Sequence, residues 1–80
     1  MTIAYINVED TLGTDYLEEL SSNLIDDFDN ITFEVVEVTE YYLVLKVEYE
    51  EYEELQEICS TACYMLIGNN VNRFTFTINN

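Results

Sequence analysis

Residues 31–49, ITFEVVEVTEYYLVLKVEY, contain the two β-rich runs that decide the fold. The first run, 31–38, and the second, 41–49, are dominated by β-branched and aromatic residues, and they meet around residues 39–40. This pattern predicts a β-hairpin, although no Asn-Gly pair marks its turn. The apolar alternation slips by one residue at positions 35–36, which predicts a β-bulge in the first of the two strands.

A helix is predicted on each side of this hairpin. Residues 14–28 repeat apolar side chains at helical spacing, with Thr14 as candidate N-cap and acids in the first turn. Residues 50–67 show a second helical repeat, and Gly68 is expected to stop that helix. The residues expected to face the core are Leu17, Leu20, Leu24 and Phe28 on the first helix, and Tyr52, Leu55, Cys59, Ala62 and Leu66 on the second.

Two further strands are predicted, at residues 2–8 and 72–79. The last alternates strictly, with Phe74, Phe76 and Ile78 expected inward and Arg73, Thr75 and Thr77 outward. The resulting order, β-α-β-β-α-β, predicts a single α+β domain over residues 1–80 with a ferredoxin-like fold, in which two helices cover one face of an antiparallel sheet. The first and third strands are apolar on both faces and should be central, whereas the second and fourth should be edges.

The charge of the chain is very uneven. It has 17 Asp and Glu, no His, and only Lys46 and Arg73 as cations, so the formal net charge is −15. Most small domains carry a net charge magnitude of roughly 2–8, because like-charge repulsion destabilises the compact state. We interpret the excess as selection against positive charge. An acidic surface of this kind repels nucleic acid backbones and anionic membranes, so neither is an expected ligand.

The sequence also bears on location and on the cysteines. No apolar run approaches the ~20 residues that span a bilayer, and residues 1–10 lack the basic start of a signal peptide. We therefore expect the cytoplasm, which is the host cytoplasm if the protein is phage-encoded. Cys59 and Cys63 are four residues apart, which is not the spacing of a zinc knuckle or a redox pair, and we interpret them as small core residues.

Enzymatic chemistry is not expected. There is no His, neither Cys has an activating base, and no Gly-rich phosphate loop occurs, so we expect no catalytic site and no cofactor. Residues 26–30, DDFDN, offer oxygen ligands but lack the Gly and the closing Glu of a calcium loop. No dedicated metal site is expected.

The acidic surface is the strongest functional signal. Glu50, Glu53, Glu54 and Glu57 fall within one sector of the second predicted helix, and Tyr64 continues it. Like charges at this spacing cost a few tenths of a kcal/mol each, so we infer that they serve a partner. The residues expected to bind it are Glu48, Glu50, Glu51, Glu53, Glu54, Glu57 and Tyr64 around the second helix, Asp15, Glu19 and Asp26 on the first, and Glu34 and Glu37 on the second strand.

Size, charge and stripes such as EYEEYEELQE (48–57) give a class-level resemblance, without an aligned motif. The chain resembles the phage-encoded acidic mimics of nucleic acid: small anti-CRISPR proteins, anti-restriction proteins and uracil-DNA glycosylase inhibitors. The resemblance implies competitive occlusion of a basic groove that holds DNA or RNA. The expected partner is a CRISPR effector of the Cas9 or Cascade type, with a restriction enzyme or DNA-repair enzyme as alternatives. A monomer is favoured, and a homodimer is left open.

Two expectations make this interpretation specific. Charge reversal of Glu50, Glu54 and Glu57 together should abolish inhibition without unfolding, whereas reversal at Asp15 and Glu19, together with Asp26, should weaken it less. Tyr49, Tyr52 and Tyr64 are the expected aromatic anchors, although Tyr52 is also expected in the core. The alternative function is a small acidic adaptor or oligomeric subunit that binds through an uncovered sheet face carrying Tyr42 and Val44.

Overall fold

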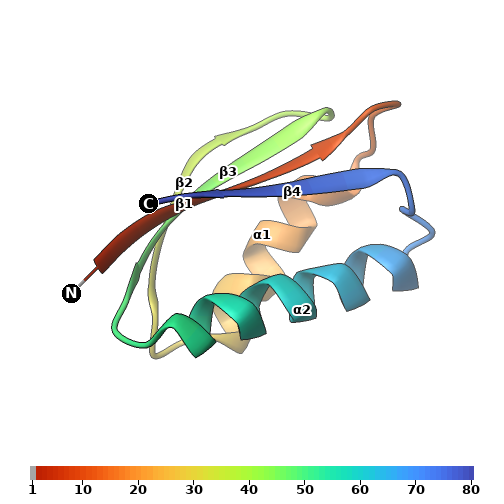
Figure 1. Ribbon diagram of the computed structural model, residues 1–80. Coiled ribbons are helices and arrows are strands. Elements are labelled where there is room, and N and C mark those ends of the chain that lie inside the picture. Colours follow the sequence, from red (N-terminus) through yellow and green to blue (C-terminus); the bar gives the residue numbers. More distant parts are fainter. Residues whose placement is uncertain (1) are drawn as a thin grey trace.

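The computed structural model describes residues 2–80. Its elements, in chain order, are β1 (Thr2–Asp10), α1 (Tyr16–Asp27), β2 (Thr32–Val38), β3 (Tyr42–Tyr49), α2 (Tyr52–Gly68) and β4 (Phe74–Asn79) (Figure 1). The four strands form one sheet in the order β2-β3-β1-β4, and every neighbouring pair is antiparallel. This order and the two helices confirm the predicted ferredoxin-like α+β fold.

The central and edge positions of the strands are also as predicted. β1 and β3 pair with each other in the middle of the sheet, with Ile6 opposite Leu45, while β2 and β4 lie at the two edges. Both helices pack on one face of the sheet, and the other face carries no helix (Figure 1). We call this uncovered side the open sheet face. Neither helix in residues 2–80 has the length and apolar composition needed to cross a membrane.

The core lies between the sheet and the helices. Its largest fully buried apolar side chains are Ile6, Val8, Leu43, Leu45 and Val47 from the sheet, Leu17, Leu20 and Leu24 from α1, and Leu55, Ile58 and Leu66 from α2. Full burial of such a side chain contributes about 1.5–3 kcal/mol. These residues include Leu17, Leu20 and Leu24 of the predicted inward stripe, whereas Phe28, which follows α1, is only partly buried against the core.

The predicted stripe of α2 needs one correction. Ile58 is fully buried, whereas Tyr52 is 56% exposed. At about 100° per residue, Ile58 and Tyr52 lie equally far to either side of a stripe centred on Leu55, Ala62 and Leu66, so angular position alone does not separate them. Tyr52 is the first residue of α2. The helical spacing of Tyr52 from Leu55 was therefore misleading.

The predicted hairpin between β2 and β3 is closed by a threonine. Thr39 donates its backbone N–H to the Tyr42 carbonyl at 2.8 Å, and Thr39 Oγ1 accepts the N–H groups of Tyr41 and Tyr42 at 3.0 and 3.1 Å. A Ser or Thr hydroxyl can stabilise a turn in this way without an Asn-Gly pair. The register shifts between Val35 and Glu37, which confirms the predicted bulge in β2.

The ends of the helices differ in detail from the prediction. The N-cap of α1 is Asp15, which makes no side-chain capping hydrogen bond, and the predicted cap, Thr14, lies one residue earlier, where its Oγ1 accepts the Tyr16 N–H at 3.2 Å. Gly68 is the last residue of α2, and Asn70 is the residue in left-handed conformation, with φ of 63°. Asn tolerates this conformation better than most residues do, so it takes the role expected of Gly68.

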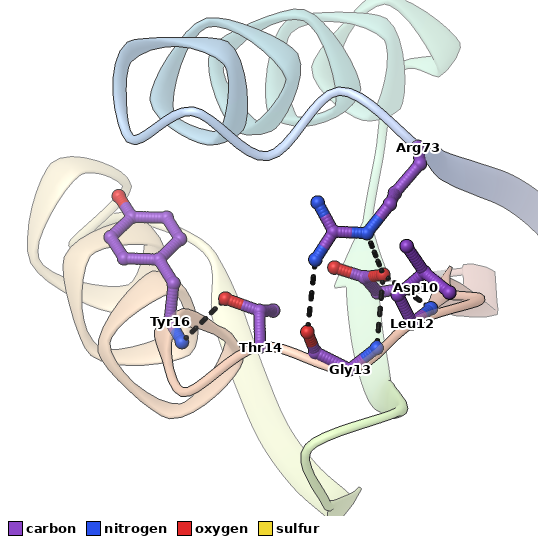
Figure 2. A network of polar contacts seen from close by, with 6 residues as sticks. All are labelled: Asp10, Leu12, Gly13, Thr14, Tyr16 and Arg73. Atoms are coloured by element: carbon purple, nitrogen blue, oxygen red, sulfur yellow. Dashed lines mark hydrogen bonds and ion pairs between the residues drawn. The ribbon is translucent and has the colours of Figure 1, made fainter.

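The loop between β1 and α1 is organised by a buried carboxylate, as Figure 2 shows. Asp10 Oδ1 accepts the N–H groups of Leu12 and Gly13, and it also lies 3.1 Å from Arg73 Nε. Arg73 was predicted to point outward along the last strand. Instead β4 begins at Phe74, and the guanidinium of Arg73 folds back onto Asp10 and the Gly13 carbonyl. The electrostatic attraction of the buried Asp10 explains this difference.

Candidate functional site

The outer side of the helix layer is acidic. Neither α1 nor α2 contains a Lys or an Arg. The exposed acids of the two helices and of the residues just before them are Asp15, Glu18, Glu19, Asp26, Asp27, Glu50, Glu51, Glu53 and Glu57. We call this set the acidic helix face. It contains most of the residues predicted to bind a partner.

The two cations of the chain lie away from this face. Arg73 is paired with Asp10 beside the β1–α1 loop. Lys46 lies on the open sheet face, directly opposite Glu34 of β2 and Tyr5 of β1 in the strand register. Among residues 2–80, therefore, no cation offsets the charge of the acidic helix face. Its negative potential is unscreened except by salt.

A shallow groove of about 480 Å³ lies along α2 at the end of α1. Glu53, Glu57 and Tyr64 line it from α2, together with Phe28. Tyr64 is 80% exposed. An aromatic ring beside two carboxylates can take an Arg or Lys side chain, since the acids bind its charge and the ring contacts its face. The structure thus brings three predicted residues together.

The remaining predicted residues fall into separate groups. Glu48, Glu50 and Glu54 border a second hollow, next to Thr32 and Tyr49. Asp15 and Glu19 line a third hollow on α1, together with Glu18 and Ser22. Asp26 and Glu51 are exposed but are not among the residues that line these hollows.

Glu34 and Glu37 lie on the open sheet face. Glu34 is opposite Lys46 and Glu37 is opposite Val44, and these β3 residues point away from the helices because they alternate with the buried Leu45. A single flat partner surface cannot contact these two acids and the acidic helix face at once. Their part in partner binding stays a prediction that concerns a different side of the molecule.

Glu54 has a local structural task. Its Oε1 accepts the backbone N–H groups of Glu50 and Glu51, each at 2.9 Å, which satisfies two donors at the start of α2. These hydrogen bonds favour the charged carboxylate and lower the pKa of Glu54 below its ordinary value. Glu50 and Glu51 also precede the helix, which begins at Tyr52, so the predicted helical stripe is shorter than residues 50–57.

Some acids occupy positions where their charge opposes folding. Asp26 and Asp27 are in the last turn of α1, and that turn has no basic residue. The C-terminal end of a helix carries partial negative charge, so an acid there costs about 0.3–1 kcal/mol. Asp26 and Asp27 of the acidic helix face are therefore expected to lower the stability of the fold.

Two exposed acids of the face were not singled out from the sequence. Glu18 and Asp27 each adjoin a predicted residue, Glu19 and Asp26, and both are exposed on α1. The acid pairs at positions 18–19 and 26–27 were the available signal. One predicted anchor is also misplaced, because Tyr49 is buried in the core.

The two cysteines are not activated. Cys59 and Cys63 are free and partly buried on α2. Burial raises the pKa of both thiols, and the neighbouring Cys63 raises that of Cys59 further. Both therefore remain largely thiols near neutral pH, which does not suit nucleophilic chemistry. Cys59 packs against the core, in line with its interpretation as a small core residue.

Comparisons of the chain with protein-family models, with curated proteins and with solved structures return no match. The site is an acidic surface with the exposed Tyr64 in one of its hollows.

Proposed function

We propose that this protein is an inhibitor that mimics nucleic acid: its acidic helix face enters a basic groove that otherwise holds DNA or RNA. The observation that carries the proposal is that both cations of the chain lie away from the acidic helix face. The acidic helix face has no cation, while Arg73 is held by Asp10 and Lys46 lies on the opposite side of the sheet. An ordinary solvated helix face mixes both signs.

The spacing of the acids suits this role. Glu53 and Glu57 are one helical turn apart, which places their Cβ atoms roughly 5–6 Å from each other. Flexible side chains can spread this separation toward the distance between neighbouring phosphates. Side chains that bind phosphates can bind carboxylates in the same way, Arg through two parallel hydrogen bonds and Lys as a point charge. Long-range attraction would also make association fast and sensitive to salt.

The proposed partner is a CRISPR effector of the Cas9 or Cascade type. Such effectors hold a guide–target heteroduplex in a positively charged channel and recognise it by backbone and shape, which an acidic protein surface can imitate. Restriction enzymes and DNA-repair enzymes also have basic grooves. The proposal therefore includes them as outcomes of the same experiment, with no catalytic activity for this chain.

A capture experiment with purified proteins tests the proposal. The immobilised protein is exposed to a Cas9-type effector, a Cascade complex, a restriction endonuclease and a uracil-DNA glycosylase, each with and without its nucleic acid already bound. We expect capture of at least one of them, and loss of that capture when the groove is already filled. Capture of none, or capture that is indifferent to bound nucleic acid, would refute the proposal.

The open sheet face favours a second candidate function, that of an adaptor. Ile3 and Tyr5 are 42% and 39% exposed there, beside the partly buried Tyr42 and Val44. The Tyr42 hydroxyl donates to the Glu37 carboxylate, and this hydrogen bond, with the nearby charge, raises the pKa of Tyr42. If Val44→Glu abolished partner capture while charge reversal on the acidic helix face left it intact, the adaptor would replace the inhibitor as the better account.

A further inference from the structure

The two edges of the sheet differ in a way that bears on self-association. Edge strands offer unpaired N–H and C=O groups, and proteins usually protect them with charges or bulges. β2 has both devices, since it carries Glu34 and Glu37 and its register is broken between Val35 and Glu37. A further strand cannot pair with β2 without meeting these acids and the bulge.

β4 has neither device. Its sequence, FTFTIN, contains no charge, and its register with β1 is unbroken from the Phe74–Asp10 pair to the Asn79–Tyr5 pair. Within residues 2–80, β1 is its only strand partner. Its aromatic and β-branched residues favour an extended conformation. The outer edge of β4 is therefore a regular, uncharged row of donors and acceptors.

The distribution of charge leaves this side open to a second copy. Residues 58–80 contain no Asp or Glu, and their one charged residue, Arg73, is paired with Asp10. Two copies with a net charge of −15 each repel one another wherever their acids meet. α1 packs against β2 and β3, whereas α2 connects β3 to β4, and Ile67 near the end of α2 is 61% exposed.

The strand is also self-complementary. Around Phe76, the pattern is apolar–Thr–apolar–Thr–apolar from Phe74 to Ile78. In an antiparallel pair of two such strands centred on Phe76, Phe74 faces the second copy's Ile78, and Thr75 faces its Thr77. Aromatic and β-branched pairs and Thr–Thr pairs of this kind stabilise antiparallel sheets.

We propose that two copies of this chain associate through β4, with antiparallel pairing centred on Phe76, to form one continuous sheet. The twofold axis of such a pair is perpendicular to the sheet, so both acidic helix faces lie on the same side of the dimer. Self-association does not depend on the function proposed above. The sequence analysis favoured a monomer and left a homodimer open, and the different protection of the two edges argues for the homodimer.

Light scattering coupled to size exclusion tests this proposal, with the full chain at about 10 µM to 1 mM and near-physiological salt of about 0.15 M. We expect a concentration-dependent mass that approaches twice that of one chain. The double substitution Thr75→Glu and Thr77→Glu places like charges opposite each other and should weaken the dimer at least about tenfold. The control, Thr32→Glu with Val36→Glu on β2, adds the same charge and should leave the dimer intact.

Hydrogen exchange supplies the second readout. Amides of β4 should become protected as the concentration rises, and amides of β2 should not. A chain that stays monomeric up to about 1 mM would overturn the proposal. So would a dimer that persists in the folded Thr75→Glu, Thr77→Glu variant, or one that is lost on Val44→Glu, since that dimer would use the open sheet face.

Discussion

Arg73 Nε lies 3.1 Å from Oδ1 of Asp10, and this ion pair joins the start of β4 to the end of β1. The Asp10 side chain is fully buried, whereas that of Arg73 is 35% exposed. The Nε–H is not aligned for a hydrogen bond, so this contact is chiefly electrostatic. Arg73 Nη2 donates to the Gly13 carbonyl at 3.0 Å. One of the two cations of the chain, Arg73, therefore has a structural role.

The first prediction compares the two cations. Arg73→Met leaves the Asp10 charge buried without a counterion. We expect it to lower the free energy of unfolding by about 3 kcal/mol. This is the lower end of the range for breaking a buried ion pair, because Arg73 is partly exposed. Lys46→Met makes the same change in net charge on the open sheet face. Its free energy of unfolding should stay within about 0.5 kcal/mol of the wild-type value. Urea denaturation measures both, and equal effects would contradict the structural role of Arg73.

The second prediction concerns the two ends of α1. Asp27→Asn removes an acid from the C-terminal turn and should stabilise the protein, whereas Glu19→Gln removes one from the first turn, where it is favourable. Each substitution relieves the overall repulsion equally, so the difference between them isolates the interaction with the helix dipole. We expect a difference of about 0.6–2 kcal/mol in unfolding free energy, twice the single-site value. Identical shifts in thermal midpoint would exclude this explanation.

The third prediction is a pH dependence. The folded-state pKa of Glu54 is lowered by its two backbone hydrogen bonds. Its contribution to stability is therefore present above the unfolded-state pKa and is lost as the pH falls through the folded-state value. Glu54→Gln should destabilise α2 near neutral pH and approach the wild type in acid. Glu57→Gln, one turn along without such bonds, should show no such convergence, and a constant gap for Glu54→Gln would disprove the capping role.

The fourth prediction concerns Gly13, which has φ of 85° in the β1–α1 loop. A Cβ at this position would lie 3.1 Å from Cε1 of Tyr41, and an L residue rarely adopts such a φ. Gly13→Ala should therefore destabilise the protein by about 1 kcal/mol or more. Gly68, in the last position of α2, has open space around it, and Gly68→Ala should be neutral or stabilising. In thermal melts the midpoint should fall for Gly13→Ala and should stay unchanged or rise for Gly68→Ala, and a fall of equal size in both would contradict this account.

The sequence predicted the element order because each segment has a clear apolar period. The β-branched and aromatic residues of 41–49 and the alternation in 72–79 indicated strands, helical spacing from Leu17 to Leu24 indicated α1, and the slip beside Val35 indicated the bulge. These signals are local. The acidic helix face could be anticipated for the same reason, since neighbouring acids on a helix share its outer side.

The features that the sequence did not predict depend on contacts between distant segments or on the exact position where a helix begins. Asp10 is a polar residue at the end of a strand, and nothing local indicates that Arg73 folds onto it. Tyr52 has helical spacing from the core but lies where α2 begins. The task of Glu54 depends on where the helix starts, a boundary that periodicity locates only within a few residues.

The hydrogen bonds of Glu54 at the start of α2 change which charge-reversal variant should be used to test the acidic helix face. Reversal of Glu50, Glu54 and Glu57 would also remove the hydrogen bonds at the start of α2, and lost binding could then reflect a frayed helix. Reversal of Glu50, Glu53 and Glu57 keeps Glu54 in place. A matched control reverses Glu9, Glu34 and Glu37, which lie on the open sheet face.

The central claim, that the acidic helix face takes the place of nucleic acid, is tested most directly by displacement. A labelled DNA duplex is bound to a guide-loaded Cas9-type effector, or to whichever protein the capture experiment yields, and its anisotropy is followed as this protein is added. We predict that the wild type and the Glu9, Glu34, Glu37 reversal release the DNA. The Glu50, Glu53, Glu57 reversal should need at least about tenfold more protein, which corresponds to about 1.4 kcal/mol. Release by the helix-face variant together with failure of the open-face variant, or no release by the wild type at any concentration, would contradict the claim.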